Sequence, residues 1–333
     1  MHHTPHLPDY LDILTIPTPF PVGPVNVYLV KGDDGPTLID VGPRFGPAQE
    51  ALREALAARG YQLSDVKRVI LTHVHSDHCG LAGELAEESG AEVLTHPANF
   101  LLLADSAEER ERWLAFYAAL MREAGMPPEQ IAQVDRLRRG MSNYIAPVQP
   151  TGVLAEGDTV CLGGEDWRVL HTPGHAGGLI CLYQPRRRLL ISSDHLLRDV
   201  SSNPLVEPPE REGGERPRRL AEYLSQLQRV AELPVDLALP GHGPSIPDVS
   251  ELVARRRAFH EARARQIAES LQDGAHTVYE LTLSLFPRLD PINRFLAISE
   301  VLGHLEVLEL RGEVASAVEN GVRLWWVQPR PDR

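Results

Sequence analysis

Thr72-His73-Val74-His75-Ser76-Asp77-His78 is the most informative segment of this sequence. It places three histidines and a carboxylate directly after the apolar run Val66-Lys67-Arg68-Val69-Ile70-Leu71, which is typical of a buried strand. A helix-prone segment, residues 84–89, follows. Imidazole and carboxylate groups are ligands that Zn²⁺ and neighbouring first-row metals prefer. The motif therefore predicts a metal site on the turn from a strand into a helix.

The spacing within this motif predicts ligands for two metals rather than for one. His73 and His75 point the same way in an extended segment, because side chains alternate with a period of two. Asp77 and His78 begin the next turn and can face a second point nearby. The alternative is a chance cluster of surface histidines, since the chain has 14 of them. Ligand-type residues elsewhere in the chain argue against that alternative.

Three further ligand-type residues follow apolar, strand-like runs in the same way. They are His175 in Leu170-His171-Thr172-Pro173-Gly174-His175, Asp194 in Leu189-Leu190-Ile191-Ser192-Ser193-Asp194, and His242 in Leu237-Ala238-Leu239-Pro240-Gly241-His242. Neighbouring glycine and proline residues favour tight loops at these positions. If the ends of these strands lie at the same edge of the fold, their histidine and aspartate side chains form a single metal site with many ligands.

With these motifs the chain resembles the metallo-β-lactamase-fold hydrolases. All five hallmark motifs of that superfamily occur in order, the first being Asp40 in Thr37-Leu38-Ile39-Asp40-Val41-Gly42. The resemblance implies an α+β fold, an αβ/βα sandwich of two sheets covered by helices, with the metals at one edge. It also implies two divalent metal ions, Zn²⁺ first, with iron or manganese as alternatives.

The resemblance assigns each ligand to one of the two metals. The first metal would be held by His73, His75 and His175, the second by Asp77, His78 and His242, and both by a bridging Asp194. Bridging aspartate is the pattern of the glyoxalase II-like, lactonase, arylsulfatase-like and nuclease branches. Asp77 is expected to orient the nucleophilic hydroxide and to receive its proton. Asp40 is expected to hold a ligand histidine in one tautomer or, alternatively, to cap a turn.

Composition limits the class of protein and its partners. No apolar run approaches the ~20 residues of a membrane span, and residues 1–10 lack the features of a signal peptide, so we expect a cytoplasmic protein without membrane contact. The three widely spaced cysteines argue against a disulfide framework. The formal net charge of −13 disfavours nucleic acid as a partner and favours a small-molecule substrate.

The length of 333 residues is enough for one large and one small domain. We expect a hydrolase domain over residues 1–250, and within it a helical insert over residues 98–150. The insert would contain a helix over Ser106–Glu123 and a second helix that starts with proline at Pro128. It is interpreted either as a lid over the metal cleft that lines the substrate pocket or, alternatively, as an insert that is purely structural or forms the interface of a homodimer.

Residues 251–333 predict a small second domain. Three helices followed by a hairpin, whose turn is Glu319-Asn320-Gly321, resemble a winged-helix module. The segment 296–312 resembles the C-terminal domain of metallo-β-lactamase-like proteins that include an endoribonuclease. Three glutamates in the expected recognition helix, Glu300, Glu306 and Glu309, favour a structural or interaction module over a DNA reader.

Candidate substrate contacts lie outside the metal motifs. His195 and Asn203 belong to the segment that follows Asp194, and Arg256, His260 and Arg263 share one helix face by their spacing. The expected function is hydrolysis of a thioester or related acyl bond of a small molecule at a binuclear, glyoxalase II-like site. A single-strand-specific endoribonuclease is the alternative, with RNA as its partner, because the Arg256 face could meet phosphate.

Overall fold

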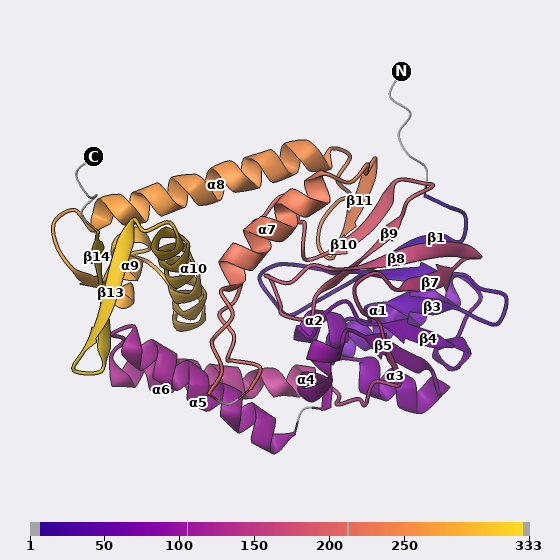
Figure 1. The fold of residues 1–333 in the computed structure, drawn as a ribbon. Coiled ribbons are helices and arrows are strands. Elements are labelled where there is room, and N and C mark those ends of the chain that lie inside the picture. Colours follow the sequence, from indigo (N-terminus) through magenta and orange to yellow (C-terminus); the bar gives the residue numbers. More distant parts are fainter. Residues whose placement is uncertain (1–6, 105, 212, 329–333) are drawn as a thin grey trace.

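The computed structural model describes residues 7–104, 106–211 and 213–328, and the two larger β-sheets of this part lie in the right half of the view in Figure 1. Within this part of the chain, the first sheet is β1 (Leu11–Ile16), β2 (Val25–Val30), β3 (Thr37–Ile39), β4 (Arg68–Ile70), β5 (Glu92–Thr95) and β6 (Gly152–Val153), in that order. The second sheet has the order β11-β10-β9-β8-β7. Its strands are β7 (Thr159–Leu162), β8 (Glu165–His171), β9 (Ile180–Gln184), β10 (Leu189–Ser193) and β11 (Leu237–Pro240).

The two sheets pack against each other through one apolar core. Tyr28, Ile39 and Ile70 of the first sheet share this core with Trp167 and Ile191 of the second. Strands β2, β9, β10 and β11 are buried along their whole length, which explains why they are nearly continuous apolar runs.

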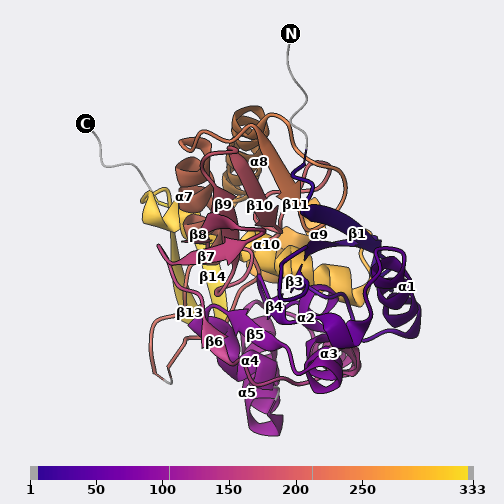
Figure 2. The same cartoon turned by 90° about the vertical axis from the view of Figure 1, so that its right-hand side faces the viewer.

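Helices cover the outer face of each sheet. Helices α1 (Gly46–Ala57) and α3 (Ala82–Ser89) pack on the first sheet, and α7 (Arg219–Ala231) and the first turns of α8 (Val249–Ser270) pack on the second. Figure 2 shows these two pairs of helices on opposite sides of the sandwich. The fold is therefore the expected α+β sandwich with helix, sheet, sheet and helix layers.

Strand direction brings the loops with ligand-type residues to one edge. Strands β3, β4 and β5 run parallel, as do β10 and β11. Strand β8 runs in the direction of β10, because both are antiparallel to β9. The segments that follow β3, β4, β8, β10 and β11 therefore leave the sandwich at the same end, and each of them carries a residue of the candidate site.

The insert packs on the C-terminal part of the chain. It contains the helices α4 (Phe100–Ala104), α5 (Ala107–Glu123) and α6 (Pro128–Met141) and the 3₁₀ turn η3 (Ser142–Tyr144). Two more 3₁₀ turns lie earlier in the chain, η1 (Leu63–Asp65) and η2 (Pro97–Asn99). The C-terminal elements are α8, β12 (His276–Thr277), α9 (Val278–Leu285), α10 (Pro291–Leu310), β13 (Val314–Glu319) and β14 (Val322–Val327). Tyr117 and Val134 of the insert share one core with Ile267, Phe295 and Trp325.

The expected boundary after residue 250 falls inside α8, whose beginning packs on the second sheet and whose end packs on α10. The region from α8 to β14 contains, in order, a helix, a strand, two helices and a hairpin. Its strands form a three-stranded sheet in the order β12-β14-β13. Its division into a separate winged-helix domain stays a prediction. None of the described helices combines the length and the apolar composition of a membrane span.

Candidate metal centre

The loop after β4 is held in place by Asp40, which follows β3. The Asp40 backbone has a φ of 59° and its N–H donates to the Ile70 carbonyl oxygen at 2.8 Å. The carboxylate accepts hydrogen bonds from the backbone N–H of Thr72 at 2.8 Å and from the Thr72 hydroxyl. It also lies 2.7 Å from Nδ1 of His78. Asp40 therefore fixes both ends of the histidine motif.

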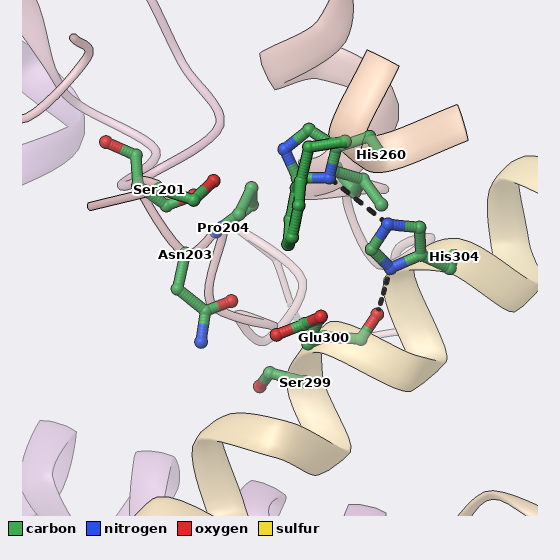
Figure 3. A pocket seen from close by; sticks show the side chains of 10 residues that line it. Ser201, Asn203, Pro204, His260, Ser299, Glu300 and His304 are labelled. Carbon is green, nitrogen blue, oxygen red and sulfur yellow. Dashed lines mark hydrogen bonds between the residues drawn. The ribbon is translucent and has the colours of Figure 1, made fainter. Parts of the chain in front are cut away.

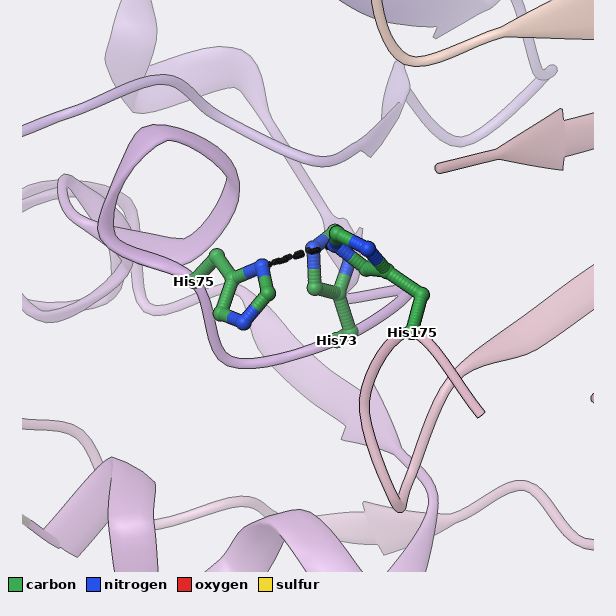
Figure 4. Close-up of side chains that lie close together, drawn as sticks. All are labelled: His73, His75 and His175. Atoms are coloured by element: carbon green, nitrogen blue, oxygen red, sulfur yellow. Dashed lines mark hydrogen bonds between the residues drawn. The ribbon is translucent and has the colours of Figure 1, made fainter. Parts of the chain in front are cut away.

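Three imidazoles converge at the first cluster (Figure 4). Nε2 of His73 lies 3.1 Å from Nδ1 of His75, and the same His75 atom lies 2.8 Å from Nε2 of His175. Burial lowers the pKa of His73 well below its usual range and the pKa of His175 to about 3, so these rings are neutral. Neutral imidazoles are the form that binds divalent metals.

Asp77, His78 and His242 form the second cluster. Both Asp77 and His78 lie on the short helix α2 (Ser76–Cys79), and His242 follows β11. Nε2 of His242 lies 3.3 Å from a carboxylate oxygen of Asp77. The other ring nitrogen of His242 donates to the carbonyl oxygen of Pro24 at 2.8 Å, which leaves Nε2 as the nitrogen that faces the cluster.

The carboxylate of Asp194 lies between the two clusters. Its Oδ1 is 3.4 Å from Nε2 of His78, and its Oδ2 is 3.5 Å from Nε2 of His175 and 3.7 Å from Nε2 of His242. A Cβ atom on Gly241 would lie 2.1 Å from Oδ1 of Asp194, so only glycine leaves room for this carboxylate. The arrangement matches a carboxylate that bridges two metals.

The residues of both clusters fit divalent metal ions. Several of their polar atoms are buried and have no hydrogen-bond partner among the described residues, namely Nε2 of His78, Oδ1 of Asp194 and Nε2 of His242. Unpaired acceptors in a buried cluster are costly unless a cation binds them. A third set with metal-ligand spacing, Asp40, His73 and His78, is explained by the hydrogen bonds of Asp40 described above.

The residues expected to contact the substrate lie outside the two metal clusters. His195 is fully buried beside the Tyr223 ring, 5.5 Å away between centroids, and does not join the clusters. Arg256 donates to the carbonyl oxygens of Leu197, Arg198 and Val200, so it braces the loop after Asp194.

His260 and Asn203 line a small cavity of about 40 Å³ between that loop, α8 and α10 (Figure 3). His260 is 4% exposed and bonds to His304, while Arg263 pairs with Glu300 at 2.9 Å. The Arg256, His260 and Arg263 side chains therefore do not form the open face expected from their spacing, because Arg256 contacts the loop after Asp194 and the other two contact α10. Their role in substrate binding stays a prediction.

Sequence reasoning missed several residues that shape the centre. The hydroxyls of Thr72 and Ser193 lie 2.7 Å apart, and the Thr72 hydroxyl lies 3.0 Å from Nδ1 of His73. In the sequence, only their positions next to the ligand residues His73 and Asp194 indicate that Thr72 and Ser193 belong to the centre. Arg138 of α6, whose charge acts on His75, had no signal of its own.

Comparison with known proteins gives a consistent result. The sequence model of the Metallo-beta-lactamase superfamily matches residues 20–242. The probable metallo-hydrolase YqjP of Bacillus subtilis is 35% identical over 303 residues, which are 91% of this chain and 93% of that protein. The acyl-coenzyme A thioesterase MBLAC2 of Bos taurus is 28% identical over 65% of this chain and 72% of its own. The crystal structure of a metallo-beta-lactamase family protein from Thermus thermophilus superposes with a TM-score of 0.80 at 32% identity, covering 96% of this chain and 99% of that one.

Proposed function

This chain belongs to the metallo-beta-lactamase superfamily and is a metal-dependent hydrolase, and we propose that it cleaves a thioester or related acyl bond of a small molecule at a two-metal centre. The observation that carries the two-metal proposal is the position of Asp194. Its oxygens lie within 3.7 Å of histidines of both clusters, His175 of the first and His78 and His242 of the second. A single carboxylate so placed is suited to bind two cations at once.

The proposed ligands are those of the two clusters, with Asp194 shared. Imidazole and carboxylate donors suit Zn²⁺, and also iron and manganese. When bound, a pair of such ions supplies a water-derived nucleophile at neutral pH and polarises the scissile carbonyl. The protein residues then position the reacting groups and move the proton.

We assign proton transfer to Asp77. Burial opposes its ionisation, but His242, whose Nε2 lies 3.3 Å from the carboxylate, and the nearby charge of His78 hold the Asp77 pKa below its usual value. Asp77 is therefore ionised at neutral pH and can accept a proton from the nucleophilic water. The hydrogen bonds of His78 to Asp40 and of His242 to Pro24 keep the ligand rings oriented during this step.

The choice of a thioester as substrate rests on two supports. A relative that covers 65% of this chain is named an acyl-coenzyme A thioesterase. The net charge of −13 disfavours a long polyanion such as RNA in the cleft. The face of α8 that could have met phosphate does not offset that charge, since Arg263 pairs with Glu300 and His260 is buried.

Thiol release from a panel of coenzyme A and glutathione thioesters tests this proposal. The metal-loaded protein should release thiol, and the same protein stripped of metal by a chelator should not. If none of the thioesters releases thiol although two metals per chain are confirmed, the thioester assignment is overturned. Single-stranded RNA would then be the next substrate to assay.

A further inference from the structure

The end of helix α6 is fixed beside the metal-binding turn. Arg138 lies in the last turn of this helix, which leads into η3. The carbonyl oxygen of Tyr144 in η3 accepts from the Arg44 N–H at 2.9 Å, and the Ala146 N–H donates to the Gly80 carbonyl oxygen at 2.7 Å. Gly80 directly follows α2, which carries two residues of the second cluster. Arg138 therefore belongs to a segment that lines the region of the metal centre.

The guanidinium of Arg138 rests on two buried aromatic rings. Its Cζ atom lies 3.8 Å from the ring centroid of Tyr117 and 4.6 Å from that of Phe295. The Nε atom is buried and has no hydrogen-bond partner among the described residues. The rings hold the planar group in place and give part of the stabilisation that a desolvated cation needs.

No carboxylate pairs with Arg138 in the part of the chain that the structure describes, although acidic residues outnumber basic ones by 46 to 33. The next residue shows the contrast, because Arg139 pairs with both Glu111 and Asp135 on the surface. A half-buried arginine without an acidic partner is costly unless an anion binds it. The missing partner is the first indication of a ligand.

Backbone contacts place the end of the Arg138 helix near the metal clusters. The chain passes from α6 through η3 to Ala146, which bonds to Gly80 at the end of α2, the helix that carries Asp77 and His78. An anion held by Arg138 would thus lie near a substrate bound at the metals.

We propose that Arg138 binds an anionic group, a carboxylate or a phosphate, of the substrate whose acyl bond is cleaved at the metal centre. This inference rests on the proposed function and narrows its substrate class to acyl compounds that carry an oxyanion. The forked, planar guanidinium can donate two parallel hydrogen bonds to either oxyanion.

Binding of matched thiols to the metal-loaded full-length protein tests the inference by calorimetry. N-acetylcysteamine and N-acetylcysteine differ by one carboxylate, and pantetheine and 4′-phosphopantetheine differ by one phosphate. The native protein should bind the anionic member of at least one pair about 10- to 100-fold more tightly, which is the effect of a hydrogen bond to a charged group. The pair that shows the preference identifies the oxyanion.

Three variants sharpen the test. Arg138→Met keeps an apolar chain on the two rings and should abolish the preference, whereas Arg138→Lys keeps the charge without the fork and should retain part of it. Arg136→Met removes the same charge from an exposed position of the same helix and should retain all of it. Should Arg138→Met fail to fold, the reduced preference of Arg138→Lys carries the test.

An equal preference in the native protein and Arg138→Met, or no preference for either anionic thiol, would overturn the inference. Failure of the proposed function is a separate result, since it shows as absent thioester turnover whatever the thiols bind.

Discussion

Nδ1 of His78 lies 2.7 Å from a carboxylate oxygen of Asp40, and both side chains are sealed from solvent. The hydrogen bond turns the opposite nitrogen of the ring toward Asp194. The same carboxylate accepts from the N–H and hydroxyl of Thr72, which precedes His73. One aspartate therefore orients a proposed ligand of the second metal and the loop that carries a proposed ligand of the first.

Asp40→Asn should weaken metal binding while the chain stays folded. The amide keeps the size of the carboxylate but loses its charge and one acceptor, so the His78 ring is held less firmly. Loss of such a partner typically lowers metal affinity about 10- to 100-fold. Competition with a chromogenic chelator measures the change. Asp236→Asn, which alters an exposed ion pair with Arg188, is the control, and equal affinities in the two variants would contradict the prediction.

Asp77→Asn should lower turnover about 10²- to 10⁴-fold, the range expected when a proton-transfer group is removed. The amide can still lie beside His242 but cannot take a proton from water. The rate constant should be measured together with the metal content, because Asp77 is also a proposed ligand. A variant with full metal content and near-native turnover would remove the role assigned to Asp77.

Asp194→Ala should leave the protein with at least one metal fewer per chain. The carboxylate faces both clusters, so its removal deprives each of them of an anionic oxygen. Elemental analysis after gel filtration gives the metal content directly. Asp199→Ala changes an exposed aspartate in the following loop and should keep the native content. Two metals per chain in Asp194→Ala would refute the bridging assignment.

The candidate metal centre could be predicted from sequence because each of its residues follows a strand. The apolar runs before Asp40, His73 and Asp194 mark strand ends, and parallel strands bring such ends to one edge. The apolar runs also predict the α+β sandwich, because their length and apolar composition are typical of strands that are covered on both faces. Strands β2 and β10 are indeed buried along their whole length.

The substrate contacts could not be predicted in the same way. The spacing of Arg256, His260 and Arg263 gives one face of α8 but not what packs on that face. His304 of α10 covers it, and α10 lies later in the chain. Arg138 presents the same difficulty, since its helix is polar in sequence and only tertiary packing brings Phe295 to it.

Gly177→Ala should displace the loop that carries His175. The Gly177 N–H donates to Glu207 at 3.0 Å, and Glu207 forms a buried ion pair with Arg219. An added Cβ would lie 2.2 Å from Nη2 of Arg219 and 2.7 Å from Oε2 of Glu207, so the loop or the ion pair must move.

The measurable result of Gly177→Ala is weaker metal binding together with a lower melting temperature. Gly46→Ala provides the control, since an added Cβ there meets no atom within 4 Å. Native metal affinity in Gly177→Ala would show that the loop adapts without moving His175.

His260 and His304 form a buried pair in which both rings are neutral. Nδ1 of His304 donates to the Glu300 carbonyl oxygen at 2.7 Å, so its Nε2 accepts from Nδ1 of His260 at 3.1 Å. Burial lowers the pKa of His260 to about 3 and the pKa of His304 to about 4, and the positive charges of Arg263 and Arg256 act in the same direction on His260.

The free energy of unfolding should therefore fall as the pH decreases below about 6.5, the pKa of a histidine in the unfolded chain. The folded-state values are lower, so the unfolded chain takes up protons that the folded chain does not. The stability from this pair is complete above that pH and is lost toward pH 4, with a slope of up to about 1.4 kcal/mol per pH unit for each histidine. His260→Asn keeps a donor for His304 but does not titrate, so urea denaturation between about pH 4.5 and 7.5 should give a smaller slope for this variant. All other titrating groups are common to the two proteins, and equal slopes would show that His260 does not take up a proton on unfolding.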